Sequence, residues 1–200
     1  GRKIQDRTKR NQIMNRLNTY RASAHAGRTT ENNFKNLMIS RGNKVRKASF
    51  EDDCANFVDF IIKPKKGKLA KIQVKNRNTP GRGCSPDDSH ITLELKNTIG
   101  KDGWLYGDSN FLAKEVENGF YIYEMETLKE FAEARTAKNV TCTRLVDTYV
   151  KGMPYKIYKR KGTHGHKNYD ELIYAKVSDI KDFFGEKGKK IHSLEYPQSE

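Results

Sequence analysis

Two neighbouring apolar segments, Phe57-Val58-Asp59-Phe60-Ile61-Ile62 and Leu69-Ala70-Lys71-Ile72-Gln73-Val74-Lys75, decide how this sequence is expected to fold. A Lys-Pro-Lys-Lys-Gly-Lys stretch at 63–68 separates them. Proline and glycine favour chain reversal, so the two segments predict an antiparallel hairpin. With residues paired about the centre of this turn, Asp59 lies opposite Gln73. Lys75 then projects from the same face of the strand as Gln73, beside Asp59.

A carboxylate, an amide and an amine in such apolar segments are costly to bury unless they bind an ion or one another. The Asp59 carboxylate and the Gln73 amide supply oxygen ligands of the kind that Mg²⁺ prefers, and the backbone carbonyl of Val74 offers a third. Lys75 is then placed to orient water or to offset charge on a phosphate. The alternative interpretation is an ion pair between Asp59 and Lys75, with Gln73 as a satisfied polar neighbour.

One carboxylate and one amide hold a cation weakly, so a further acid is expected, and Glu31 is the candidate. The run Thr29-Thr30-Glu31 is typical of a helix start, and Gly42 is typical of the end of that helix. Helical spacing places Glu31 near Phe34 and Met38 on the apolar face. We therefore expect Glu31 to point towards the sheet.

The order of these groups resembles the PD-(D/E)XK nuclease superfamily, in its variant with glutamine in place of the second acid. Ile72-Gln73-Val74-Lys75-Asn76-Arg77 is similar to the strand of Gln-type members, which include intron-encoded homing endonucleases and phage nucleases. The helix and hairpin are also similar to those of archaeal Holliday-junction resolvases. The resemblance covers about residues 29–131. Many Gln-type members carry a second aspartate where this chain has Asn110, and no catalytic role is assigned to that residue.

This resemblance implies a fold, a cofactor and a set of site residues. The implied fold is an α/β, restriction-endonuclease-like core, with a mixed β-sheet flanked by helices. The implied cofactor is Mg²⁺ or Mn²⁺. The implied catalytic residues are Asp59, Gln73, Lys75 and Glu31, and the implied metal ligands are Asp59, Gln73, Val74 and Glu31.

A rival stretch spells the superfamily motif more literally, with Pro86-Asp87-Asp88 followed by Glu94-Leu95-Lys96. Its aspartates lie in a predicted turn, with no apolar strand before them. Glu94 and Lys96 are expected on the solvated face of a strand. The site around Asp59 is therefore favoured over this one.

The charge of the chain favours a polyanionic partner. The sequence has 39 Lys+Arg against 25 Asp+Glu, a net charge of +14, and a pI near 9.6. Residues 1–28 are especially basic and show helical spacing of apolar residues, which predicts a helical arm along a duplex. A solvated tail or a helix packed on a partner subunit is the alternative. The residues predicted to contact nucleic acid are Arg7, Lys9, Arg10, Arg16, Arg21, Arg28, Lys65, Lys66, Arg77 and Arg82.

Four regions are expected along the chain: the basic N-terminal arm at 1–28, a nuclease core at 29–137, a C-terminal α+β extension at 138–186, and a mobile tail at 187–200. In the extension we expect strands over 140–150, 154–159 and 172–177, and a short helix capped by Ser178. His164 and His166 lie in a basic loop without partners at zinc-ligand spacing, so contact with DNA is the favoured role. No segment is apolar enough for a membrane span, and three unpaired-looking cysteines fit an intracellular, cytoplasmic setting.

The expected activity is therefore divalent-metal-dependent hydrolysis of phosphodiester bonds in DNA. Double-stranded DNA or a DNA junction is the expected partner. Cutting both strands favours a homodimer or a higher symmetric oligomer. A site-specific phage- or intron-type endonuclease is favoured, closely followed by a junction resolvase. Two alternatives stay open: an endoribonuclease with a similar core, and a catalytically silent DNA-binding protein that retains the nuclease fold.

Overall fold

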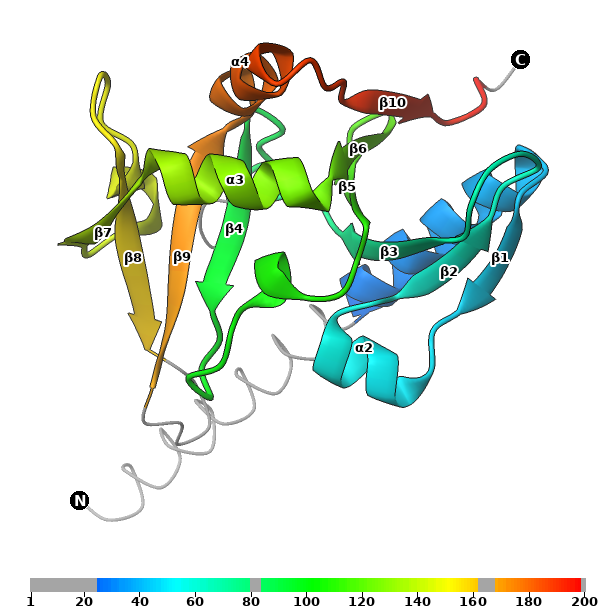
Figure 1. The fold of residues 1–200 in the computed structure, drawn as a ribbon, viewed down its shortest axis with the longest axis horizontal. Helices are drawn as coiled ribbons and strands as arrows, with labels where there is room; N and C mark the ends of the chain where they lie inside the picture. Colours follow the sequence, from blue (N-terminus) through cyan, green and yellow to red (C-terminus); the bar gives the residue numbers. More distant parts are fainter. Residues whose placement is uncertain (1–24, 80–83, 162–167, 199–200) are drawn as a thin grey trace, which may run out of the picture.

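The computed structural model describes residues 25–79, 84–161 and 168–198, which form two mixed β-sheets flanked by helices (Figure 1). The first sheet has the order β1 (Lys44–Lys47), β2 (Phe60–Lys63), β3 (Ala70–Lys75), β5 (Phe111–Val116), β6 (Gly119–Glu124), β10 (His192–Glu195). The second has the order β4 (His90–Lys96), β9 (Tyr169–Lys176), β8 (Tyr155–Lys161), β7 (Thr136–Cys142). Strands β3 and β5 run parallel, as do β7 and β8, and the other paired strands are antiparallel.

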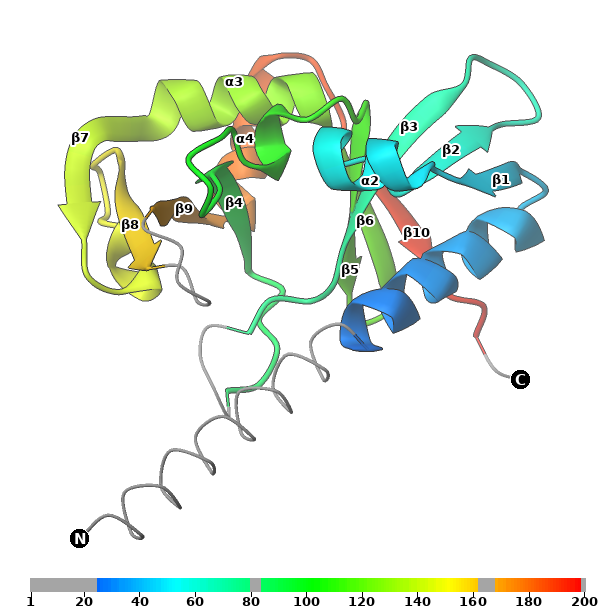
Figure 2. The same cartoon turned by 90° about the horizontal axis from the view of Figure 1, so that it is seen from below.

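The helices cover different faces of these sheets. The described part of the first helix covers residues 25–40 and lies along one face of the first sheet (Figure 2). The remaining helical segments are α2 (Phe50–Asn56), η1 (Trp104–Tyr106), α3 (Met125–Arg135), η2 (Leu145–Thr148) and α4 (Val177–Glu186). Helix α3 contacts α4 and η1, on the side of the second sheet. Within the described residues, no helix combines the length and the apolar character needed to cross a bilayer.

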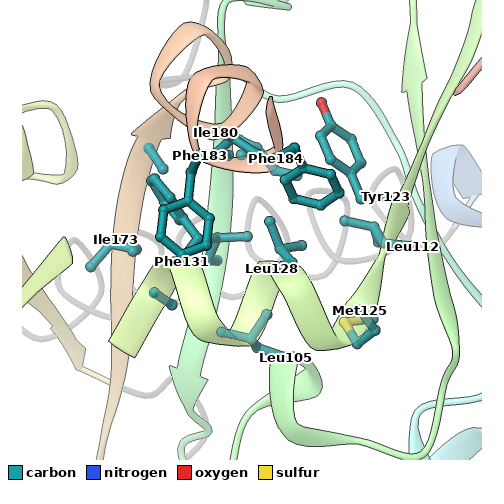
Figure 3. Close-up of a cluster of buried hydrophobic side chains, with 14 of the residues drawn as sticks. Leu105, Leu112, Tyr123, Met125, Leu128, Phe131, Ile173, Ile180, Phe183 and Phe184 are labelled. Atoms are coloured by element: carbon teal, nitrogen blue, oxygen red, sulfur yellow. The ribbon is translucent and has the colours of Figure 1, made fainter. Parts of the chain in front are cut away.

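Alternation of side chains along β3 separates two apolar cores. Ile72 and Val74 point towards the first helix, where they pack with Phe34 and other side chains. The neighbouring strand β5 turns Leu112 to the opposite face, into a second core that includes Leu128 and residues of α4, β4 and β9 (Figure 3). Successive side chains of a strand point to opposite faces, so Gln73 and Lys75 project from the face opposite to Ile72 and Val74. This is the face directed towards the second sheet.

The local predictions are confirmed where sequence signals are strong. Gly42 has φ of 79°, a left-handed conformation that suits glycine at the end of the first helix. That helix already includes residues 25–30, so the predicted start at Thr29 is wrong. Helix α3 buries Leu128 and Phe131 and ends at Arg135.

Some predictions for the C-terminal part are wrong. The single strand expected over 140–150 is replaced by the end of β7 and by η2. Ser178 lies inside α4, whose N-cap is Lys176. The predicted mobile tail contains β10, which pairs with β6. Strand β4 lies in the predicted core at 29–137 but belongs to the second sheet, and β10 lies in the predicted tail but belongs to the first sheet. The two sheets therefore do not correspond to the predicted division of the chain at residue 137.

Candidate metal and catalytic site

The predicted register of the hairpin is confirmed. Phe60 pairs with Ile72, and the Asp59 N–H donates to the Ile72 carbonyl at 2.9 Å, so Asp59 lies opposite Gln73. The Asp59 Oδ2 atom accepts hydrogen bonds from Gln73 Nε2 at 2.9 Å and from the Val74 N–H at 2.6 Å. The carboxylate and the amide that were predicted in neighbouring strands therefore touch.

The chain before β2 explains how Asp59 reaches across to β3. Helix α2, which was not predicted from the sequence, is capped by Ser49 and ends at Phe57, a non-glycine residue with φ of 54°. The strand therefore begins at Phe60 and not at Phe57 as expected. The ladder between β2 and β3 ends at the pair of Phe60 and Ile72, so the Asp59 side chain accepts the Val74 N–H beyond the end of the ladder.

Burial disfavours the charged form of both ionisable groups at this site. Asp59 and Gln73 are each only 4% exposed. Burial raises the pKa of Asp59 to about 6, although the Val74 N–H and Lys75 oppose that shift. Burial also lowers the pKa of Lys75, and the Asp59 carboxylate is the strongest opposing charge. The protein therefore maintains a carboxylate and an amine in surroundings where the ionised form of each is costly.

Gln73 provides the observation that points most directly to a ligand. Its amide nitrogen is bonded to Asp59, but its Oε1 atom is buried without a hydrogen-bond partner in the described structure. A buried, unpaired carbonyl oxygen is costly, and a bound cation would satisfy it. Carboxylate and amide oxygens are the donors that Mg²⁺ and Mn²⁺ accept, so Asp59 and Gln73 fit a hard divalent cation.

The other predicted ligands are placed differently. Glu31 forms an ion pair with Lys47 at 3.3 Å, while its charge also contributes to the raised pKa of Asp59. Val74 gives its N–H to Asp59, and a role for its carbonyl stays a prediction. In the described ranges no three His, Cys, Asp or Glu side chains gather in a way that could hold a metal. The oxygen set of this site therefore depends on Asp59 and Gln73.

The sequence did not predict that β4 and the neighbouring segment η1 line one side of the site. Lys75 Nζ lies 5.4 Å from the centre of the Trp104 ring, and the Trp104 backbone N–H donates to Glu94 Oε2 at 3.3 Å. Glu94 is partly buried and its pKa is raised by that burial, so its placement on a solvated face was wrong. Only the Gly103-Trp104 pair hinted at this contact, because a tryptophan beside a glycine is typical of a packed turn.

The predicted nucleic-acid contacts divide into three groups. Arg28, Lys65 and Lys66 are exposed. Arg77 is held by Asp88 through bonds of 2.9 and 2.8 Å from Nε and Nη2, so it is not a free surface cation. Arg7, Lys9, Arg10, Arg16, Arg21 and Arg82, with His164 and His166, lie outside the described residues. Asn110 has a structural role, since its Oδ1 accepts the Lys71 N–H at 2.8 Å.

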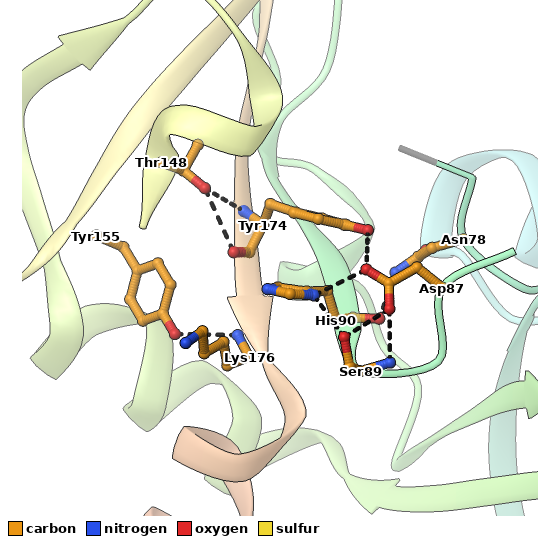
Figure 4. A network of polar contacts seen from close by, with 8 residues as sticks. All are labelled: Asn78, Asp87, Ser89, His90, Thr148, Tyr155, Tyr174 and Lys176. Atoms are coloured by element: carbon orange, nitrogen blue, oxygen red, sulfur yellow. Dashed lines mark hydrogen bonds and ion pairs between the residues drawn. The ribbon is translucent and has the colours of Figure 1, made fainter. Parts of the chain in front are cut away.

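A second polar network joins the start of β4 to β9 (Figure 4). Asp87 Oδ2 lies 2.8 Å from both Tyr174 Oη and His90 Nδ1, and Oδ1 accepts the Ser89 N–H at 2.9 Å. The imidazole of His90 stacks on Tyr174, with ring centres 4.5 Å apart. Asn78, which follows the end of β3, donates to the His90 carbonyl at 2.6 Å and ties this network to that strand.

Comparison with known proteins adds no family: no protein-family model, curated protein or solved structure matches this chain.

Proposed function

We propose that this protein is a divalent-metal-dependent endonuclease that hydrolyses phosphodiester bonds in DNA, with Asp59, Gln73 and Lys75 at its active site. The observation that carries the proposal is the hydrogen bond from Gln73 Nε2 to Asp59, together with the buried Gln73 Oε1 atom, which has no hydrogen-bond partner among the described residues. Lys75 projects from the same face, two residues along β3. On one sheet face, an acid and an amide oxygen can hold a divalent cation, and an amine can offset the charge that develops on a phosphate during metal-assisted hydrolysis.

The residues have distinct roles in this mechanism. Asp59 and Gln73 would hold the cation, and a cation bound there would supply Lewis-acid chemistry: polarisation of the phosphate and a lower pKa for a water molecule. Lys75, whose pKa is lowered by burial, can accept a hydrogen bond from water when neutral and offset negative charge when protonated. The Val74 N–H fixes the orientation of the Asp59 carboxylate. The raised pKa of Asp59 means that the cation competes with a proton for this carboxylate.

The fold is consistent with this proposal. The first helix, the antiparallel strands β1, β2 and β3, and the parallel neighbour β5 support a restriction-endonuclease-like core, with Asp59 and Gln73 on adjacent strands. We further propose that a homodimer or higher symmetric oligomer cuts double-stranded DNA or a DNA junction. The exposed Lys65 and Lys66, in the turn of the catalytic hairpin, are placed to contact phosphates of such a substrate.

Incubating the protein with plasmid, a four-way junction and single-stranded RNA, in Mg²⁺, Mn²⁺ or EDTA, tests the proposal. The expected result is cleavage of DNA with either metal and none with EDTA. Lys75→Ala should abolish it, and Lys138→Ala, which removes an exposed lysine of β7, serves as the control. A wild-type protein that cuts none of these substrates with any divalent ion contradicts the proposal, and cleavage confined to RNA supports the ribonuclease alternative.

One observation favours a second candidate, a DNA-binding protein without catalysis. The described residues hold no group of three acids, histidines or cysteines at a metal-binding distance, and Glu31 is engaged by Lys47. In that case, DNA binding should fall steeply with salt and should not be strengthened by divalent ions, which compete for the phosphates. Binding measured by fluorescence anisotropy, with and without Ca²⁺, separates the two candidates.

A further inference from the structure

The candidate amine of the site contacts the segment η1, which packs against β4 of the second sheet. Lys75 Nζ lies over the indole of Trp104 at 5.4 Å, within the range of a cation–π contact. Trp104 is only 6% exposed and belongs to the larger apolar core, so its position is fixed by packing. Lys75 therefore extends from the first sheet onto a packed aromatic surface of η1.

Glu94 holds this surface in place. Its Oε2 atom accepts the Trp104 backbone N–H at 3.3 Å. The neighbouring Gly103 donates its N–H to the Leu95 carbonyl at 3.0 Å, which folds the turn back over β4. A Cβ atom at position 103 would lie 2.7 Å from Glu94 Cγ and 2.3 Å from the Glu94 carbonyl oxygen. Only glycine at 103 allows the turn to approach Glu94 this closely.

Glu94 and Lys75 both contact Trp104. The Glu94 carboxylate accepts the Trp104 backbone N–H, and the Lys75 amine lies over the Trp104 ring. Two opposite charges that are partly buried near each other offset part of the desolvation cost that each would carry alone.

We propose that Glu94 is a positioning residue of the candidate active site, which holds the Lys75 amine in place through its charge and through Trp104. The catalytic consequence rests on the proposed endonuclease function. The physical coupling between Glu94 and Lys75 does not depend on that function. The site is therefore shared by both sheets, although its metal ligands come from the first sheet alone.

A double-mutant cycle with Glu94→Gln and Lys75→Met tests the coupling in urea unfolding. Glutamine retains an oxygen that can accept the Trp104 N–H, so the change removes the charge and leaves this contact possible. In the wild type, Glu94→Gln removes both the cost of burying the Glu94 charge and its attraction for the Lys75 ammonium, so the unfolding midpoint should change little. In Lys75→Met it removes an unpaired, partly buried carboxylate, so the midpoint should rise. The expected coupling is about tenfold in the unfolding equilibrium constant.

Glu171→Gln is the matched control. Glu171 lies on β9, next to the residue that pairs with Glu94, but its carboxylate is paired with Lys96 at 3.7 Å and Lys159 at 3.4 Å. Its effect should be the same in the wild type and in Lys75→Met. If Glu94→Gln also shifts both midpoints equally, the inference is overturned, whether or not the protein cuts DNA. A second cycle with Lys75→Gln guards against a fold change caused by methionine.

Cleavage kinetics test the catalytic part of the inference. Glu94→Gln should lower kcat about tenfold and change KM little, because Glu94 acts through Lys75 and does not touch the substrate. An unchanged kcat in a folded Glu94→Gln protein overturns the positioning role. A protein without any nuclease activity contradicts the proposed function instead, and leaves the unfolding cycle as the test of the coupling.

Discussion

Asp59 and Asp87 are two partly or fully buried carboxylates with opposite surroundings. Asp87 is contacted by the Ser89 N–H, the Ser89 hydroxyl, Tyr174 and His90. Burial tends to raise its pKa, but these hydrogen bonds outweigh burial and hold the pKa at about 2. Asp59 accepts two hydrogen bonds, and burial raises its pKa to about 6. The hydrogen bonds around Asp87 stabilise its ionised carboxylate. Burial disfavours the ionised carboxylate of Asp59.

This difference separates a structural cluster from a candidate functional site. A carboxylate whose donors are all supplied by the protein has no need of a ligand. Asp59 lies beside the Gln73 Oε1 atom, which has no hydrogen-bond partner in the part of the chain that the structure describes, and this is where we propose that a cation binds. Strongly shifted pKa values of this kind gather at functional sites, because function and not stability maintains them.

The largest expected effect is on catalysis. Asp59→Asn should lower Mg²⁺-dependent DNA cleavage by at least about a hundredfold, because it removes the charged metal ligand that is paired with Gln73. Asp87→Asn is the matched control and should retain cleavage within a few-fold of the wild type. Plasmid nicking assays measure both. Equal decreases in the two variants would remove the distinction between the two regions.

The next expected effect is on stability, with opposite signs at the two aspartates. A shift of the Asp59 pKa from 3.8 to about 6 corresponds to a cost of about 3 kcal/mol for the ionised group at neutral pH. Asp59→Asn should therefore raise the free energy of unfolding by about 2 kcal/mol. Asp87→Asn should lower it by about 1 kcal/mol, because it weakens hydrogen bonds to a charged acceptor. Urea unfolding at pH 7.5 tests whether the two changes differ in sign.

The pH dependence sharpens the same comparison. The folded-state pKa of Asp59 lies above its unfolded value, so its contribution to stability is complete below about pH 4 and is lost as the pH rises through about 6. The folded-state pKa of Asp87 lies below its unfolded value. Its contribution to stability is therefore present above about pH 4 and is lost as the pH falls towards 2. The stability of the wild type relative to Asp59→Asn should therefore fall between pH 4 and 7, and a flat difference would contradict the assigned pKa.

The smallest expected effect concerns the basic side chains near each region. The logarithm of the DNA-binding constant falls linearly with the logarithm of the salt concentration, and the slope reflects the number of phosphates neutralised. Replacing Lys65 and Lys66 by alanine should reduce this salt slope by about 1 for each phosphate that these lysines neutralise in the wild type. Arg77→Ala should change the slope less, because Arg77 is held by Asp88. Fluorescence anisotropy over a range of salt concentrations measures the slopes. A larger effect of Arg77→Ala would show that this pair opens to bind DNA.

The hairpin was predictable from sequence because its signals are local. A turn rich in proline, glycine and lysine, flanked by apolar alternation, fixes which residues face each other, and the pairing of Asp59 with Gln73 follows from it. Gly42 at the end of the first helix was predictable for the same reason. Each of these features depends on residues that lie close to one another along the chain.

What was missed depends on contacts between distant parts of the chain. The segment at 192–195 is polar and short, and it becomes a strand only because β6 offers a free edge. Glu94 resembles a solvated strand residue until Trp104, whose ring Lys75 contacts, comes to lie against it. The hairpin that carries the candidate site was therefore predictable from the sequence, but the contribution of Glu94 and Trp104 was not.

The most direct test of the central claim is a Mn²⁺ titration followed by the emission of Trp104, the only tryptophan in the chain. Paramagnetic Mn²⁺ bound beside Lys75 should quench this residue, since its ring lies 5.4 Å from Lys75 Nζ. We expect saturable quenching in the wild type and in Asp87→Asn, competition by Mg²⁺, weaker binding below pH 6, and no saturable quenching in Asp59→Asn. Equal quenching in the wild type and Asp59→Asn, or none in the wild type, would contradict a metal site at Asp59 and Gln73.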